Sequence, residues 1–253
     1  MHMSWAEFRQ HFGLGGTRIP NLRAGVTGAP FKKNSAKSNP SSVDWTSAGA
    51  VTGVKDQGSC GSCWSFATTG SLEGAYYLKY NTLQSFSEQH LVDCDKLDQG
   101  CNGGWMTRAY TWMKHNGGIC TEADYPYTSG NGKEGTCGDV TCTAVKEVTP
   151  TSYTEVTPES VADLESAVAQ QPVAIAVAVN QNFQFYSSGV FDGECGQDIN
   201  HGVLLTGYGT DSEDFWKIKN SWGTSWGEGG YIRVLKDDSN LCEVMAAPVF
   251  PNL

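Results

Sequence analysis

The spacing of apolar and polar residues changes near the middle of the chain. In the first half, apolar side chains recur at helical intervals, which predicts one helix over residues 62–78 and another over 106–115. A third helix is expected to begin after Ser87, a residue type that caps helix N-termini. The pattern therefore predicts that this half of the chain is mainly helical.

After Val148 the pattern shifts towards the two-residue period of strands. One more helix is expected here, with Thr157 as its cap and Pro158 at its first position. In residues 172–179 bulky Val and Ile alternate with Ala, which predicts a strand with one large and one small face. Further strands are expected over residues 201–209, 215–220 and 231–236. Helices followed by strands predict an α+β protein of two packed halves with a cleft between them.

Residues 1–40 are polar and lack sustained periodicity, apart from one short helix expected from Ser4. The dense aromatic, Gly and Cys content of a folded body begins near Val43. We therefore interpret the first 38 residues as an arm or leader.

Charge and hydropathy exclude two classes of partner. The chain has 17 basic and 27 acidic residues, a net charge of -10, and no basic stripe that could follow a phosphate backbone. No apolar run approaches the roughly 20 residues of a membrane-spanning helix. We expect neither a nucleic-acid nor a membrane partner.

Nine cysteines make an odd and high count, which suggests an oxidising route with eight paired and one free. Two of them, Cys60 and Cys63, form a Cys-x-x-Cys motif beside an expected helix start. Such a motif is a zinc half-site, a dithiol redox pair, or a nucleophilic thiol next to a structural cysteine.

Zinc is disfavoured because the five histidines are far apart and no second cysteine pair has matching spacing. A redox pair usually lies between a strand and a helix, and the Gly-rich segment before Cys63 does not predict such a strand. The redox pair is therefore kept as the second interpretation. A nucleophilic thiol needs a base and a group that orients the base. His201 and Asn220 lie about 140 and about 160 residues after Cys63, close to the spacing of the papain and cathepsin signature.

The stretches "DQGSCGSCWSF", "SEQHLVDC", "GCNGG", "DYPY", "NHGV" and "KNSWGTSWGEGGYIR" occur in one order along residues 40–251. This body resembles a papain-family cysteine peptidase of the cathepsin L-like type, and "SWAEFR" resembles the end of that family's propeptide. The resemblance implies a papain-like two-domain fold, with residues 48–148 mainly helical and 149–247 mainly β. It also implies a residual propeptide segment over 1–38 and a peptidase body over 39–253.

The resemblance also implies the roles of the site residues. Cys63 would be the nucleophile, with a thiol pKa lowered by the helix N-terminus and an imidazolium, and His201 its base. Asn220 would orient His201, and the Gln57 side chain with the Cys63 backbone N–H would stabilise the oxyanion. Trp222 would shield the His–Asn hydrogen bond. The remaining expected substrate-binding residues are Gly61, Gly103, Gly104, Trp105, Met106, Ala176, Ile199, Asn200 and Ala247.

An apolar residue at Ala247 predicts a preference for Leu, Phe or Val at P2, and the absence of a long His-bearing insertion disfavours exopeptidase action. Asn200 stands where many members carry Asp, which is expected to narrow the active pH range. The family's disulfides would pair Cys60 with Cys101, Cys94 with Cys137, and Cys195 with Cys242, while Cys120 with Cys142 would form a fourth bridge.

The resemblance implies a monomeric zymogen without cofactor or metal. Its partners would be protein and peptide substrates, its own propeptide as an intramolecular inhibitor, and cystatin-type inhibitors. Its compartment would be a lysosome-like acidic vesicle or the extracellular space. Two alternatives stay open: an inactive binding protein, disfavoured because Cys63, His201 and Asn220 are all present, and a peptide ligase on the same site.

Overall fold

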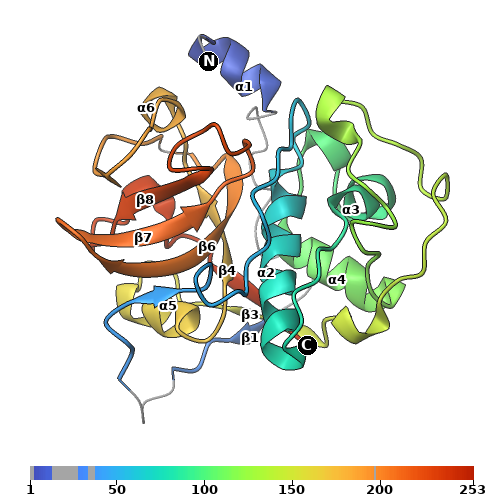
Figure 1. Cartoon of the computed structure of the whole chain (residues 1–253), viewed down its shortest axis with the longest axis horizontal. Coiled ribbons are helices and arrows are strands. Elements are labelled where there is room, and N and C mark those ends of the chain that lie inside the picture. Colours follow the sequence, from blue (N-terminus) through green and yellow to red (C-terminus); the bar gives the residue numbers. More distant parts are fainter. Residues whose placement is uncertain (1–2, 13–27, 34–37, 197) are drawn as a thin grey trace.

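The computed structural model describes residues 3–12, 28–33, 38–196 and 198–253 (Figure 1). None of the helices in these ranges is long and apolar enough to cross a bilayer. The α-helices are α1 (Trp5–His11), α2 (Cys63–Tyr80), α3 (Glu88–Cys94), α4 (Met106–Asn116), α5 (Val161–Val168) and α6 (Gln181–Gln184). The strands are β1 (Ala29–Pro30), β2 (Val43–Asp44), β3 (Ser152–Glu155), β4 (Val173–Val177), β5 (Val190–Phe191), β6 (His201–Thr210), β7 (Asp214–Lys219), β8 (Tyr231–Leu235) and β9 (Val249–Asn252).

Helix α2 runs through the centre of the molecule, with the sheet on one side and α3 and α4 on the other (Figure 1). It is buried over most of its length and ends at Asn81, whose left-handed backbone (φ 53°) stops the helix. Two glycines face the β half: a Cβ on Gly70 would lie 2.8 Å from Leu204, and one on Gly74 would lie 2.5 Å from Pro172. These glycines let the helix lie close against the sheet.

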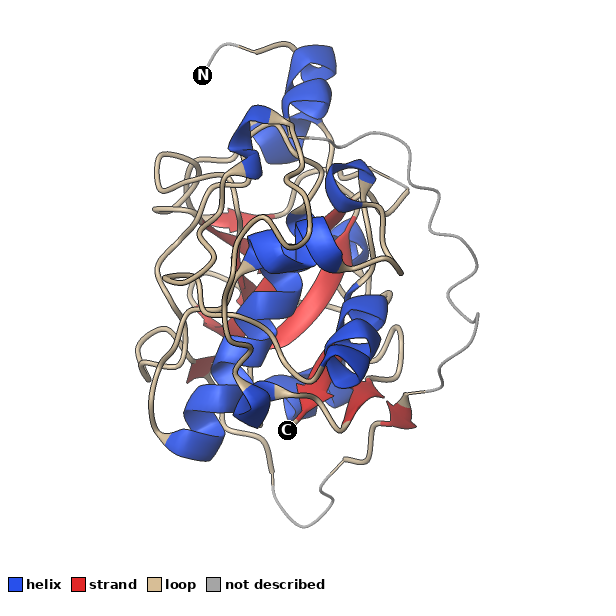
Figure 2. Ribbon diagram, turned by 90° about the vertical axis from the view of Figure 1, so that its right-hand side faces the viewer, coloured by secondary structure: helices blue, strands red, loops and turns tan. Residues whose placement is uncertain are grey.

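The described strands form one sheet in the order β1-β3-β9-β4-β6-β7-β8-β5, with β2 paired to β6. Strand β6 is central, antiparallel to both β4 and β7. The register pairs Val177 with His201 at the start of β6 and Leu204 with Lys219 at the end of β7. His201 and Asn220, the residue after β7, therefore come from adjacent strand ends. Figure 2 shows strands of the sheet lying behind helices of the helical half.

Strand β4 has the large and small faces expected from its sequence. Val173, Ile175 and Val177 belong to the larger hydrophobic core, which lies among the sheet, α5 and α6. Ala174 and Ala176 belong to the second core, which is formed mainly by α2, α3 and α4. The alternation therefore separates two cores, and the small face admits the helical half.

The expected helix after Val148 exists, but its expected start is wrong. Helix α5 begins at Val161 and is capped by Ser160, whose side chain accepts a hydrogen bond from the Asp163 N–H. Thr157 and Pro158 lie outside the helix because Glu159 has a left-handed backbone (φ 57°), which a helix cannot include. The Glu159 N–H donates instead to the Met245 carbonyl, 3.0 Å away.

The helix expected from Ser4 is confirmed. Ser4 caps α1 in a capping box with Glu7. The aromatic side chains of Phe8 and Phe12 are 4% and 3% exposed, because they pack into the larger core. Helix α1 therefore docks through its apolar face and lies at one end of the molecule, above the junction of the sheet and the helical half (Figure 1).

Candidate active site

Cys63 is the free cysteine among nine, and it is the first residue of α2. Its partly exposed side chain lies at the positive end of the helix dipole. Gly202 allows β6 to approach this point, since a Cβ there would lie 3.3 Å from the Cys63 backbone. This close approach brings His201, the residue before Gly202, into the same region.

His201 is 2% exposed and its Nε2 lies 2.7 Å from the Asn220 Oδ1. The same Oδ1 accepts the Ser221 N–H at 2.8 Å, which identifies it as the oxygen of the amide. Nε2 must therefore carry the hydrogen, and the Nδ1 atom, which has no partner among the described residues, is free to accept a proton. Trp222 stacks on the imidazole at 4.6 Å and shields it.

The Gln57 side chain is fully buried and is held in one orientation. Its Oε1 accepts a hydrogen bond from the Ser221 Oγ at 2.7 Å, and its backbone N–H donates to the Ser221 carbonyl at 2.9 Å. Its Nε2 then donates to the carbonyls of Cys60 and Phe12, both at 3.0 Å. Ser221 thus links Gln57 to Asn220. Its only sequence signal was its place next to Asn220, and we did not predict it.

Helix α1 and the residue after it pack against residues around this site. Phe8 and Phe12 contact Trp222, with ring centroids 4.9 and 5.1 Å apart. His11 Nδ1 lies 3.0 Å from the Ser59 hydroxyl. The Phe12 carbonyl thus accepts a hydrogen bond from the side-chain amide of Gln57.

A cleft of about 430 Å³ contains both Cys63 and His201. Its walls come from the start of α2, the segment before α4, and the facing ends of β4 and β6. Eight of the expected substrate-binding residues line it: Gly61, Gly103, Gly104, Trp105, Met106, Ala176, Ile199 and Asn200.

Two expected residues do not line this cleft, and two unexpected ones do. Trp222 packs on His201 instead, and Ala247 is partly exposed. Trp64 and Gly202 belong to the wall although sequence reasoning missed them. A Cβ on Gly104 would come within 2.5 Å of the Trp64 ring, so this glycine is required by packing as well.

Burial favours the neutral forms of both reactive groups. It raises the pKa of the Cys63 thiol, against the backbone N–H groups of Gly202 and Trp64. It lowers the pKa of His201 to about 4, against the hydrogen bond with Asn220. The lowered thiol pKa expected from the sequence therefore requires the imidazolium itself, because each charge of the pair must stabilise the other.

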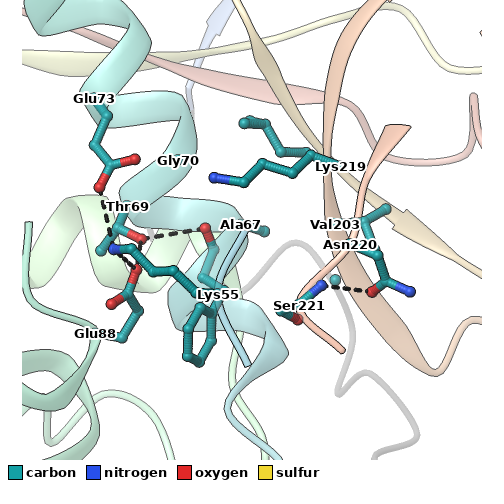
Figure 3. A pocket seen from close by; sticks show the side chains of 13 residues that line it. Lys55, Ala67, Thr69, Gly70, Glu73, Glu88, Val203, Lys219, Asn220 and Ser221 are labelled. Carbon is teal, nitrogen blue, oxygen red and sulfur yellow. Dashed lines mark hydrogen bonds and ion pairs between the residues drawn. The ribbon is translucent and has the colours of Figure 1, made fainter. Parts of the chain in front are cut away.

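A second cavity, lined by both charged and apolar residues, lies beside Asn220 and Ser221, between α2 and the strands β6 and β7. Lys55 contacts Glu73 and Glu88 at 3.3 and 2.6 Å, and Lys219 enters from the opposite side (Figure 3). Burial lowers the pKa of Lys219 to about 8, although Glu73 opposes this shift. Lys219 connects the β half to the helical half through a hydrogen bond from its Nζ to the Thr52 hydroxyl, 3.1 Å away.

Four disulfides join the expected pairs: Cys60–Cys101, Cys94–Cys137, Cys120–Cys142 and Cys195–Cys242. His90 lies with Cys120 and Cys142 in the one group of described side chains with metal-ligand proximity. The two sulfurs are bonded to each other, so they offer no thiolate, and the His90 Nδ1 accepts the Cys120 N–H at 3.2 Å. In this oxidised form the group does not constitute a metal site.

Comparison with known proteins agrees with this geometry. The family model described as "Papain family cysteine protease" matches residues 39–252. The chain is 46% identical to "Cysteine endopeptidase Rep1" of Oryza sativa subsp. japonica, over 98% of this chain and 69% of that protein.

Solved structures give the same result. The proform of the ragweed pollen allergen Amb a 11 cysteine protease has a TM-score of 0.88 and 39% identity, covering 99% of this chain and 77% of that one. Digestive procathepsin L 3 of Tenebrio molitor has a TM-score of 0.85 and 39% identity, covering 99% and 80%. Both structures contain a proenzyme. The chain therefore belongs to the papain family of cysteine proteases, with the papain-like α+β fold, and is a cysteine endopeptidase made as a zymogen.

Proposed function

We propose that Cys63, His201, Asn220 and Gln57 carry the peptidase reaction in the roles expected from the sequence. One observation carries the proposal: the free thiol and the free Nδ1 of His201 belong to residues of one cleft. The other ring nitrogen is held by Asn220. This arrangement supports a proton acceptor and a nucleophile that act in the same cleft.

In this proposal, His201 Nδ1 takes the Cys63 proton and Sγ attacks the peptide carbonyl carbon. The carbonyl oxygen becomes an oxyanion and receives hydrogen bonds from the Gln57 amide and the Cys63 backbone N–H. The imidazolium then protonates the leaving amine as the C–N bond breaks. Water, deprotonated by His201, hydrolyses the resulting thioester and restores the thiol.

The substrates proposed are proteins and peptides with an apolar residue at P2. Trp105, Met106, Ala176 and Ile199 are apolar and line the cleft together, which supports this preference. Ala247 does not line it, so the argument rests on the other four residues. A carboxylate that would favour Arg at P2 is absent from the lining residues described.

We propose further that residues 1–38 are a residual propeptide segment that inhibits the body over residues 39–253. The buried contacts of Phe8 and Phe12 with Trp222 support this, as does the bond from Gln57 to the Phe12 carbonyl. The proposed removal region, residues 37–40, begins at Lys37, outside the described residues. The two cores support a helical half over about 48–148 and a β half over about 149–247.

The proposed route is the secretory pathway, ending in an acidic vesicle or outside the cell. Four disulfides support an oxidising route. Cystatin-type inhibitors are proposed partners on the ground of family membership.

The test is cleavage of fluorogenic peptides with Leu, Phe or Arg at P2, under mild reductant at about pH 5.5, by the wild type and Cys63→Ala. We expect cleavage after Leu or Phe at P2 that is abolished in the variant. Equal rates for wild type and variant would refute the nucleophile, and Arg rivalling Leu at P2 would refute the substrate preference.

A further inference from the structure

One wall of the cleft is held from behind by a buried carboxyl group. The Asp98 side chain is fully buried, and its Oδ1 accepts the Trp105 N–H at 2.8 Å. Trp105 immediately precedes α4 and has no capping side chain of its own. Because Trp105 lines the cleft, Asp98 determines where part of that wall lies.

Packing leaves this wall little freedom. A Cβ on Gly104 would lie 2.9 Å from the Asp98 Cβ and 2.5 Å from the Trp64 ring. The Gln99 N–H donates to the Gly103 carbonyl at 2.9 Å, which closes the loop around Asp98. A displacement of Asp98 is therefore transmitted to Gly104 and Trp105.

A second buried carboxyl group, that of Asp95 at the end of α3, contacts Asp98. The two residues are 2% and 9% exposed, and each carboxyl group shifts the pKa of the other. Each Oδ1 accepts a backbone N–H, from Leu97 and Trp105 respectively, while neither Oδ2 has a donor among the described residues. A single proton held between the two carboxyl groups would give both of these oxygens a partner and would remove one of two like charges.

The surroundings compensate only one negative charge. From α4, Arg108 approaches Asp98 at 3.8 Å, and from α3 the facing group is Asp95. Within the loop, Lys96 donates to the Asp93 carbonyl instead. Burial, followed by the charge of Asp95, raises the pKa of Asp98 to about 8, and burial raises the pKa of Asp95.

We propose that Asp98 is a positioning residue for the substrate-binding wall, and that the proton it shares with Asp95 makes substrate binding depend on pH. With the proton, the pair carries one negative charge opposite Arg108. Without it, two like charges in contact repel each other, and Asp98 moves away from the Trp105 amide. This inference rests on the proposed function, in which the cleft binds substrate.

The test separates KM from kcat. Asp98→Asn keeps an acceptor for the Trp105 N–H and donates an N–H to Asp95 without a titratable proton. From about pH 5.5 to about pH 8.5 we expect KM of the wild type to rise about threefold or more, and KM of Asp98→Asn to stay constant. Asp98→Ala should have a raised KM at every pH. The kcat profiles should coincide, because the pair does not touch Cys63 or His201.

Glu122→Gln is the matched control, because it alters another carboxyl group with a raised pKa and should keep the wild-type rise in KM. A KM of the wild type that is constant with pH, or the same rise in Asp98→Asn, would overturn the inference. Failure of the proposed function would appear differently, as a wild type without Cys63-dependent cleavage. Infrared difference spectra of Cys63→Ala with and without Asp98→Asn report the shared proton independently of substrate. We expect a carboxylic acid band lost with Asp98 at neutral pH, and identical spectra would refute the shared proton.

Discussion

Phe8→Ala should release the docked N-terminal helix and activate the uncleaved chain. Phe8 is 4% exposed, with its ring 4.9 Å from that of Trp222 and 4.7 Å from that of Phe12. Burial of a Phe side chain contributes about 1.5 to 3 kcal/mol, and its aromatic pairs add about 0.5 kcal/mol or more. Because α1 docks on a body with its own cores, most of this loss weakens docking and little of it unfolds the body.

A loss of about 2 to 3 kcal/mol lowers the docking equilibrium constant about 30- to 150-fold. While the docked state dominates, the initial rate of the uncleaved chain is proportional to the undocked fraction, so it should rise by the same factor. The assay is the initial rate of fluorogenic peptide cleavage, with intact mass measured in parallel to verify that the chain is still full length.

Gln10→Ala is the matched control, since Gln10 is an exposed residue of the same helix. Its initial rate should stay within about twofold of the wild type, because its side chain buries little apolar area. Equal initial rates for Phe8→Ala and Gln10→Ala would refute the inhibitory role of this contact.

Two further predictions concern stability. Burial and the neighbouring Glu88 raise the pKa of Glu122 to about 7. Between the ordinary carboxyl pKa and about 7, the folded chain therefore binds more protons than the unfolded chain. Its free energy of unfolding falls as pH rises through that window. Glu122→Gln should therefore have the same free energy of unfolding as the wild type at about pH 4. At about pH 8 it should be about 1 to 2 kcal/mol more stable, a value that is halved because Glu122 is partly exposed. Equal denaturation midpoints of variant and wild type at both pH values would contradict this. Replacing both Cys120 and Cys142 by Ala removes a bridge with a sequence separation of 22. This double variant should unfold at lower denaturant, with a loss of about 3 kcal/mol, and an unchanged midpoint would argue against a stabilising bridge.

Local patterns predicted the elements well because they depend on neighbouring residues. The helix after Ser87 and the two-faced strand β4 follow from side-chain spacing within a few turns or pleats. The start of α5 did not follow, because a left-handed residue at Glu159 is stabilised by the distant Met245 carbonyl. Sequence cues for a cap and a first-turn proline at Thr157 and Pro158 were overridden by this long-range contact.

For the site, motif order indicated Cys63, His201 and Asn220, because each lies in a distinctive stretch of sequence. A thiol nucleophile, a base and a group that orients the base require these residue types, so the motifs that contain them indicate the site. The supporting contacts are different in kind. Ser221 binding to Gln57 joins residues 164 positions apart, and no local pattern encodes that bond.

The sequence by itself determined the family, the order of helices and strands, the disulfide pairs that the family resemblance implied, and the residues able to perform the chemistry. Only the tertiary structure decided that the Phe12 carbonyl engages Gln57, and that the buried carboxyl groups of Asp95 and Asp98 lie close together behind the Trp105 amide. The physical reason is that periodicity and motifs report on neighbours along the chain. Burial, hydrogen-bond partners and proton affinity are instead set by atoms that folding brings together from distant segments.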